Sequence, residues 1–268
     1  MKRQLARIAF RLFLGKKKRT IQVHGMRRSG NHACIDWIAN ALIESHVEWV
    51  KSNIRWISFS SHNDIVHLND VGAVSFLFFI CGIWAERKAI RSARFVIVSF
   101  EDCRPGVSFK EVAETKIVIE RPAADILASR YHNINQRALR GEGWSSQSIR
   151  ENFFSTLSAL REFGRLKTNE GVTVWDFDKW RGSRTYRTAV LHSIHLKCDI
   201  MPRMSKVGGG SSFNLSTHDD SDRIYQVSPR KEWIEYLKWV ESNHLESLEP
   251  SSRNRIQAFL QEQQNLTN

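Results

Sequence analysis

Short β-prone runs alternate along the chain with longer stretches in which apolar residues recur at helical spacing. Residues 20–24 form the first such run, and residues 31–42 follow with Ile35, Ile38 and Leu42 on one helical face. Four later runs are predicted to be strands, at residues 56–59, 95–100, 116–120 and 172–175. Three later stretches are predicted to be helices, at residues 77–90, 121–131 and 148–166, and two more flank the glycine run 208–210. The pattern predicts an α/β fold, a single domain with a central parallel sheet flanked by helices.

The first 19 residues form a segment of different character. Leu5, Ile8, Leu12 and Phe13 recur at helical spacing with bases between them. This predicts a short basic amphipathic helix that docks on the domain or contacts an anionic membrane surface. The predicted organisation is therefore a basic N-terminal segment over residues 1–19 and an α/β domain over residues 20–268.

The distribution of charge bears on the partners. The chain carries 40 Lys and Arg against 28 Asp and Glu, a net charge of +12. Eight of the bases lie in the first 20 residues, which hold no acid, so the other 248 residues carry only +4. A nucleic-acid-binding domain would carry its basic stripe on the folded surface, so no nucleic-acid partner is predicted.

Several classes of protein are excluded by composition and spacing. The longest apolar stretch, residues 71–84, has 14 residues, fewer than the roughly 20 that a spanning helix needs. Arg7 and Arg11 interrupt the first apolar run, which argues against a secretory signal. The four widely spaced cysteines form no C-x-x-C pair, and the ten histidines show no H-E-x-x-H spacing. We expect free thiols, no metal, and a cytoplasmic protein, which is membrane-peripheral only if its basic segment contacts an anionic membrane instead of docking on the domain.

A glycine-rich loop joins the first predicted strand to the first predicted helix. Gly25 and Gly30 have the spacing of a phosphate-binding loop, in which the helix N-terminus points at an anion. Asn31 and His32 stand where a nucleotide triphosphatase has Lys and Ser or Thr. Arg28 places a cation inside the loop instead. The same pattern is also typical of a glycine-rich turn with no phosphate.

A second pair of residues stands at the end of the predicted strand 116–120. Arg121 follows this strand, and Ser129 lies eight residues later in the predicted helix. An Arg at a strand exit and a Ser two turns into the next helix can close on one phosphate from two sides. An Arg cap followed by an ordinary helical Ser is the alternative.

In this order, the two elements resemble the family of sulfotransferases that use 3′-phosphoadenosine 5′-phosphosulfate (PAPS). The late segment 205–213 is similar to the family's glycine-rich loop over the nucleotide. The resemblance implies a single P-loop-type domain that uses PAPS as co-substrate without a metal. It implies the following nucleotide-binding residues: Arg27, Arg28, Ser29, Gly30, Asn31, His32, Arg121, Ser129, Lys206, Gly209, Gly210 and Ser211. Arg28 would also stabilise the charge that grows on the leaving phosphate, because an Arg keeps its proton near neutrality.

The sequence leaves several choices for the acceptor and for the base that activates it. A hydroxyl on a carbohydrate or glycolipid is the predicted acceptor, because nine Trp suit sugar stacking and the basic segment suits an anionic membrane. His62 is the first candidate for the base, since histidine titrates near neutrality. Four rivals remain open: Glu101, Asp64, His67 and Asp36.

Two alternatives to a sulfotransferase also remain open. A P-loop kinase or nucleotide hydrolase with a degenerate loop would use the strand 96–100, followed by Glu101 and Asp102, as its acidic Mg²⁺-holding strand. A non-catalytic module would bind the nucleotide but lack a base.

Overall fold

The computed structural model describes the chain in segments. These are residues 19–26, 30–54, 57–62, 64–69, 84, 86–102, 113, 115–123, 125–127, 129–131, 134, 146–168, 171–202, 231–244, 246, 250, 253–254, 256–258 and 260–261. The predicted basic segment therefore lies outside the described residues except for Arg19. The chain divides into two compact units, one of Met1–Glu120 with Arg161–Arg203 and one of Arg121–Leu160 with Met204–Asn268.

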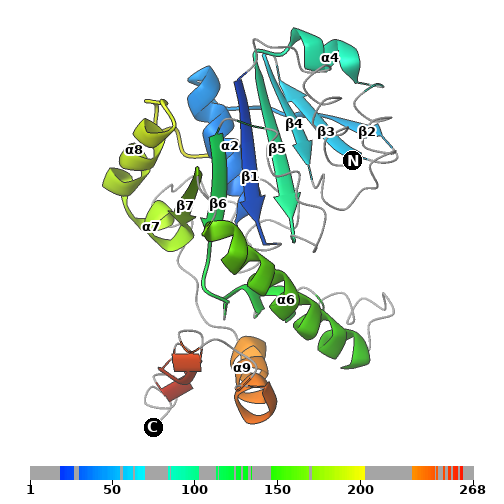
Figure 1. Ribbon diagram of the computed structural model, residues 1–268, viewed down its shortest axis with the longest axis vertical. Helices are drawn as coiled ribbons and strands as arrows, with labels where there is room; N and C mark the ends of the chain where they lie inside the picture. The colour runs from blue at the N-terminus through cyan, green and yellow to red at the C-terminus, as the bar shows by residue number, and fades with distance from the viewer. Residues whose placement is uncertain are drawn as a thin grey trace. The chain divides into compact units, whose positions relative to one another are not determined.

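The first unit is built on a seven-stranded sheet (Figure 1). Five strands run parallel, in the spatial order β4 (Ile65–Asn69), β5 (Phe95–Glu101), β1 (Arg19–Gly25), β6 (Thr115–Glu120) and β7 (Val172–Asp176). Beyond β4, β3 (Ile57–His62) and then β2 (Val50–Ile54) continue the sheet antiparallel. The predicted α/β class and mostly parallel sheet are confirmed. The antiparallel edge was not predicted, and neither β2 nor β4 was expected.

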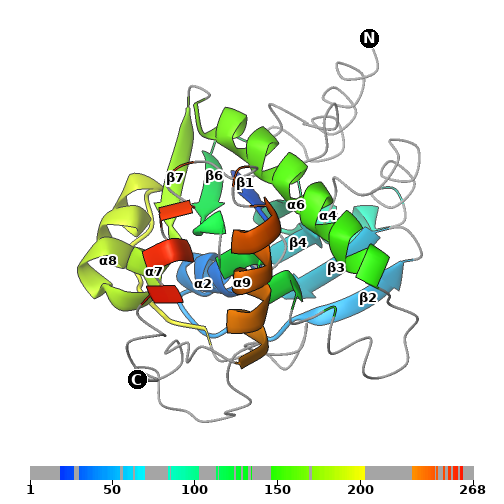
Figure 2. The same ribbon diagram turned by 90° about the horizontal axis from the view of Figure 1, so that it is seen from below.

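Helices lie at the predicted positions that the structure describes, but two helices stand before residue 208 where one was expected (Figures 1 and 2). Their bounds are α2 Asn31–Ile43, α4 Arg87–Ser92, α6 Ser146–Lys167, α7 Phe177–Gly182, α8 Arg184–Ser193 and α9 Lys231–His244. The described residues of 123–134 are also helical. Helix α4 ends two residues beyond the helix predicted for 77–90, most of which lies outside the described residues. Among the described residues, no helix has both the length and the apolarity needed to cross a bilayer.

The central strands are buried on both faces, as expected of a parallel sheet covered by helices. Ile21 and Val23 of β1 are almost fully buried, and so are Gln22 and His24 on the opposite face of the same strand. The ring of His24 stacks on Phe100 of β5 at 4.8 Å between centroids. Polar side chains thus lie in the middle of the sheet, among aliphatic neighbours.

A tryptophan cluster joins α2 to the edge of the sheet at β7. Trp37 of α2 lies edge-on to Trp175 of β7 at 5.5 Å and to Trp180 of α7 at 5.7 Å. Each of the three has at most 1% of its surface exposed. Since each large aromatic buries up to about 250 Å², this contact anchors α2 on the sheet.

The second unit has a core of its own. Its described core residues are Leu127, Phe153, Leu157, Tyr236, Leu237, Val240, Ile256 and Leu260. Tyr131 stacks on Tyr236 at 4.3 Å, and Arg130 donates a hydrogen bond to Thr156 Oγ1 at 3.0 Å. Helix α6 contributes its first part to this unit and its last turns to the first unit.

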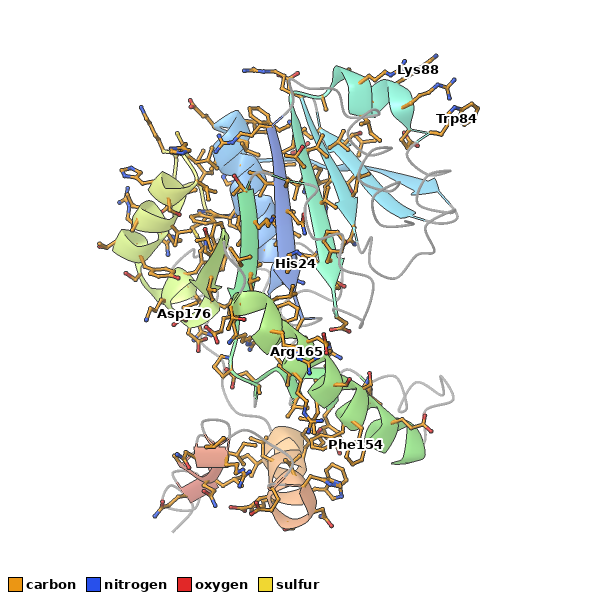
Figure 3. The ribbon with its side chains drawn as sticks, viewed as in Figure 1. His24, Trp84, Lys88, Phe154, Arg165 and Asp176 are labelled. Carbon is orange, nitrogen blue, oxygen red and sulfur yellow. The ribbon has the colours of Figure 1, made fainter. Side chains whose placement is uncertain are left out.

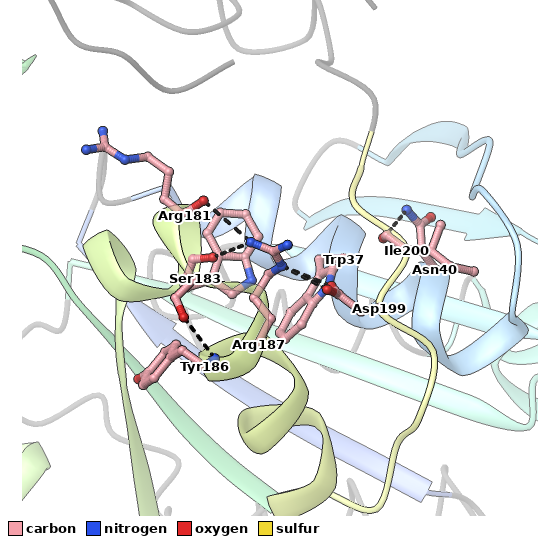
Figure 4. Close-up of polar contacts among 9 residues, drawn as sticks. Trp37, Asn40, Arg181, Ser183, Tyr186, Arg187, Asp199 and Ile200 are labelled. Carbon is pink, nitrogen blue, oxygen red and sulfur yellow. Dashed lines mark hydrogen bonds and ion pairs between the residues drawn. The ribbon is translucent and has the colours of Figure 1, made fainter. Parts of the chain in front are cut away.

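A buried ion pair ties α8 to the extended segment that follows it (Figure 4). Arg187 Nε lies 3.0 and 3.1 Å from the two carboxylate oxygens of Asp199, and the two side chains are 12% and 9% exposed. Trp37 Nε1 donates to the same carboxylate at 2.8 Å. Arg187 also donates to the carbonyl of Trp180 at 3.0 Å. The cluster joins α2, α7 and α8 in one polar network.

Removing the carboxylate of Asp199 should therefore cost stability. We expect Asp199→Ala to lower the free energy of unfolding by about 3–5 kcal/mol, because it leaves the Arg187 guanidinium buried without its counterion. Asp64→Ala is the control, since its ion pair with Arg94 is exposed at the surface and should contribute less than about 1 kcal/mol. Urea unfolding of both variants measures the difference. Equal losses would show that the Arg187 pair is no more than a surface ion pair.

Candidate functional site

The candidate site lies where the central strand of the sheet ends. In the strand register, Gly25 at the end of β1 is level with Glu101 of β5 and Ile119 of β6. From β1 the chain moves first to the β4–β5 side and then crosses to β6 and β7 on the other side. In open α/β sheets, ligands bind beyond the carboxyl ends of the strands at such a reversal. The loop between β1 and α2 is therefore placed where this fold class binds ligands.

Both glycines of this loop are required by its geometry. Gly30 immediately precedes α2 with φ 88°, in the left-handed region, and a Cβ there would lie 2.0 Å from Phe177 Cε2. A Cβ on Gly25 would lie 1.4 Å from Asn31 Oδ1, because the Asn31 side chain folds back over the end of β1. Close approach of backbone and left-handed φ are the conditions that select glycine. The two ends of the loop are thus tightly packed, at Gly25 against Asn31 and at Gly30 against Phe177.

The N-terminus of α2 faces this edge of the sheet. The first turn of α2 contains no acidic residue, and Gly30 has no side chain that could cap it. A helix N-terminus carries partial positive charge and favours anions. Asn31, the first residue of α2, is buried, whereas His32 is exposed.

An ionisable pair lies beside the loop. His32 Nε2 of α2 is 3.5 Å from Glu101 Oε1, the last residue of β5, and the side chains are 54% and 13% exposed. Asp102, the next residue, has φ 52°, and its backbone N–H donates to the Gly25 carbonyl at 3.2 Å. A non-glycine residue in the left-handed region is a small strain that the surrounding structure must hold. This turn fixes the end of β5 against the end of β1.

His24 is one residue before the end of β1 and contributes no charge. Burial, with a smaller effect of Lys116, lowers the pKa of His24 to about 4. Its Nε2 lies 2.6 Å from Gln22 Nε2. His24 is therefore neutral near pH 7 and adds no charge at the end of β1.

The structure brings together part of the predicted nucleotide site. Gly30, Asn31 and His32 lie together at the start of α2, as expected. The remaining loop and late-segment residues lie outside the described part of the chain: Arg27, Arg28, Ser29, Lys206, Gly209, Gly210 and Ser211. Their predicted roles stay predictions.

Arg121 and Ser129 belong to the second unit. Strand β6 ends at Glu120, and the helix after it begins with Ile126 N–H donating to the Pro122 carbonyl at 3.2 Å. The predicted order of strand exit, Arg and helical Ser is therefore present. The Arg121 side chain is 7% exposed, with Nε 3.9 Å from Asp125 Oδ2, and Ser129 is 1% exposed.

The structure does not bring His62 to the loop, so its expected place in the site needs correction. His62 at the end of β3 pairs with Ile65 of β4, and Ile65 pairs with Phe95 of β5. Phe95 in turn pairs with Arg19, so His62 lies at the level where β1 starts. The loop begins after Gly25, six residues further along β1, which is about 20 Å at the usual rise per residue. The reason is that β3 runs antiparallel, so its exit lies at the opposite edge of the sheet. His62 Nδ1 lies 2.8 Å from the Glu48 carbonyl.

Three of the four rival bases have other partners in the structure. Asp64 lies at the same far edge and pairs with Arg94 at 3.4 Å. Asp36 accepts a hydrogen bond from Trp49 Nε1 at 2.7 Å. His67 is buried within the sheet, where its Nε2 lies 2.9 Å from Ser99 Oγ.

The pKa of His67 adds a second reason against its role as base. Desolvation, with a smaller effect of His32, lowers this pKa to about 3, which makes the imidazole too weak a base for a hydroxyl proton. Glu101 is the candidate that the register places beside the loop. Phe177 shapes the site through packing and was not foreseen, because packing between distant segments leaves no local sequence signal. Asp102 was expected only as an acidic residue of the kinase alternative, and its left-handed backbone was not foreseen.

Substituting Gly30 should test the loop geometry. Gly30→Ala should lower the free energy of unfolding by about 1–3 kcal/mol through its left-handed backbone, with a further loss from overlap with Phe177. Gly164→Ala in α6 is the matched control. Nothing lies within 4 Å of its added Cβ, so we expect no loss and up to about 1 kcal/mol of gain. Thermal unfolding measures both, and a Gly30→Ala protein as stable as the wild type would refute the described geometry.

Comparison with known proteins completes the description of the site. No model of a protein family matches the chain, and no curated protein and no solved structure matches it. Among the described residues, no group of three or more His, Cys, Asp and Glu side chains is placed to hold a metal ion.

Proposed function

We propose that this chain is a sulfotransferase that transfers a sulfuryl group from PAPS to a hydroxyl acceptor, a carbohydrate or glycolipid. The observation that carries the proposal is the loop from Gly25 to Gly30, at the carboxyl end of the central strand β1 and directly before α2. Asn31 and His32 at the start of α2 replace the Lys and Ser or Thr that triphosphate chemistry needs. A phosphosulfate needs neither, because the reaction requires no Mg²⁺.

The resemblance implies a separate role for each of three segments. The loop, with Arg27, Arg28 and Ser29, and the N-terminus of α2 would hold the 5′-phosphosulfate. Arg121 and Ser129 would hold the 3′-phosphate. The late segment with Lys206, Gly209, Gly210 and Ser211 would cover the nucleotide. Arg28 would stabilise the transition state by its fixed charge at the bridging oxygen.

We assign the base to Glu101 rather than to His62. Its carboxylate lies at the end of β5, level with Gly25, and is mostly buried but not enclosed. In the proposed step, Glu101 takes the proton of the acceptor hydroxyl while the hydroxyl oxygen forms a bond to sulfur. The bond from sulfur to the 5′-phosphate oxygen breaks, and that oxygen leaves with the electron pair on adenosine 3′,5′-bisphosphate. His32, 3.5 Å from the carboxylate, orients it.

A second candidate function is favoured by the same carboxylate. An acidic residue at the end of the strand next to the loop is where a P-loop kinase or hydrolase holds Mg²⁺, and Glu101 occupies such a position. The sequence at residues 31–32 argues against it, since the lysine for the terminal phosphates and the hydroxyl for Mg²⁺ are both missing. Nucleotide preference separates the two candidates.

The 3′-phosphate is the group that should dominate recognition. Calorimetry should show that the protein prefers adenosine 3′,5′-bisphosphate over AMP by roughly 10² to 10⁴-fold, because two hydrogen bonds to a charged group contribute about 3–6 kcal/mol. Arg121→Ala should remove most of this preference and leave AMP binding almost unchanged. Ser129→Ala should have the same effect to a smaller degree, since a hydroxyl brings no charge.

The same titrations identify the rival functions. A kinase or hydrolase would bind ATP with Mg²⁺ best and ignore the 3′-phosphate. A non-catalytic module would bind the bisphosphate without turning over any hydroxyl acceptor. Equal affinity for the bisphosphate and AMP in the wild type would refute the sulfotransferase proposal.

The assignment of the base is tested by an isosteric change. Glu101→Gln should lower turnover by roughly 10² to 10⁴-fold, the usual contribution of a general base, while the affinity for adenosine 3′,5′-bisphosphate stays nearly the same. His62→Gln provides the comparison at the opposite edge of the sheet. A large loss of turnover in His62→Gln together with wild-type turnover in Glu101→Gln would return the role to His62.

A further inference from the structure

A basic and aromatic surface lies on α4, at the edge of the sheet opposite the loop. Arg87, Lys88 and Arg91 of α4 are three or four residues apart on the helix, except for the neighbours Arg87 and Lys88, and Trp84 precedes the helix. Ile90, on the other side of α4, is 1% exposed and packs into the core, whereas Trp84 is 58% exposed. Figure 3 shows Trp84 and Lys88 directed away from the sheet. We call these four residues, together with Arg94, the α4 surface.

The aromatic ring and the charges of the α4 surface are held together. The Arg87 guanidinium lies 4.3 Å from the centroid of the Trp84 ring, and its Nη1 donates to the Trp84 carbonyl at 3.1 Å. Lys88 and Arg91 have no ion-pair partner among the residues that the structure describes. Arg94 pairs at 3.4 Å with Asp64, but its side chain is still 71% exposed. The surface therefore presents positive charge around one exposed indole.

Strand β1 begins at the same end of the sheet. Arg19, the first residue of β1, is level with Phe95, which directly follows Arg94. Residues 1–18 hold seven further bases and no acid. The bases of the α4 surface and those of the N-terminal sequence are therefore attached to neighbouring strand starts, β5 and β1. Glu101 and Gly25 lie at the opposite ends of these two strands.

We propose that the α4 surface docks the protein on an anionic membrane. Bases near a bilayer are attracted by anionic headgroups, and indole rings prefer the level of the headgroups because one end is apolar and the other polar. A single-stranded nucleic acid suits the surface less well, because Arg87 already covers one face of the indole on which a base would stack. The proposal does not depend on the sulfotransferase assignment.

Docking in this way sets the orientation of the domain. The α4 surface lies at the strand starts, and the loop before α2 lies at the strand ends, separated by the length of β1, about 20 Å. The candidate site then faces away from the bilayer and stays open to a soluble nucleotide. A large headgroup that extends from the membrane is the kind of acceptor that could reach it.

The test is co-sedimentation of the full chain with vesicles of phosphatidylserine and phosphatidylcholine. Lys88→Gln with Arg91→Gln should weaken binding about 30-fold at low salt, since each base near an anionic surface contributes roughly fivefold. Arg87 is left in place to keep the contact with Trp84. Lys179→Gln with Arg184→Gln is the matched control, because both residues are exposed and belong to α7 and α8, which follow the end of β7. This control should bind as the wild type does, and vesicles of phosphatidylcholine alone should bind neither.

The position of the indole is tested separately. Brominated lipids in the same vesicles should quench the tryptophan fluorescence of the wild type, and Trp84→Phe should lose this quenching while still sedimenting. Equal weakening in the two double variants, or none in either, would overturn the proposal. So would quenching that persists in Trp84→Phe. If Lys88→Gln/Arg91→Gln weakens binding to a single-stranded oligonucleotide but not to vesicles, the surface is assigned to nucleic acid instead.

Discussion

The parallel pairing of β1 with β5 on one side and β6 on the other determines where the candidate residues of the first unit lie. This pairing aligns Gly25 with Glu101 and Ile119, so the loop before α2 and the carboxylate of β5 meet at one edge. It also aligns Arg19 with Phe95 at the other edge. A shift of the register by one residue would reverse the faces of every side chain on β1. The candidate phosphate site and the α4 surface are thus two consequences of one alignment, at opposite ends of the same strands.

The loop itself depends on packing from a distant part of the chain. Phe177, the first residue of α7, occupies the space that a side chain at Gly30 would need. Phe177 in turn stacks on Trp180, which contacts Trp37 of α2. The helix that starts at the loop is therefore held at its beginning and in its middle by the same short helix, α7. The N-terminus of α2 is thus held in place by the packing of α7.

Two buried histidines of the sheet differ from Glu101 in whether they can carry charge at the candidate site. His24 and His67 lie within the sheet, and burial lowers both pKa values far enough to keep the rings neutral. They satisfy hydrogen bonds, His67 with Ser99 Oγ, and carry no charge into the site. Glu101 differs because it stands at the end of its strand, partly open to solvent and beside His32. A side chain in the middle of a strand is buried and stays uncharged, whereas one at the strand end reaches solvent. This position, more than the residue type, decides which side chain can exchange a proton.

The sequence by itself determined the α/β class, most strand and helix positions, and the glycine spacing of the loop, because these depend on local periodicity and on backbone conformations that only glycine adopts easily. The expected strand 95–100 and helix 148–166 differ from β5 and α6 by no more than two residues at either end. Only the tertiary structure decided which acidic or basic side chain reaches the loop. His62 follows a strand just as Glu101 does, but β3 runs antiparallel and β5 parallel to β1. Strand direction is set by long-range pairing, which periodicity along the chain does not contain.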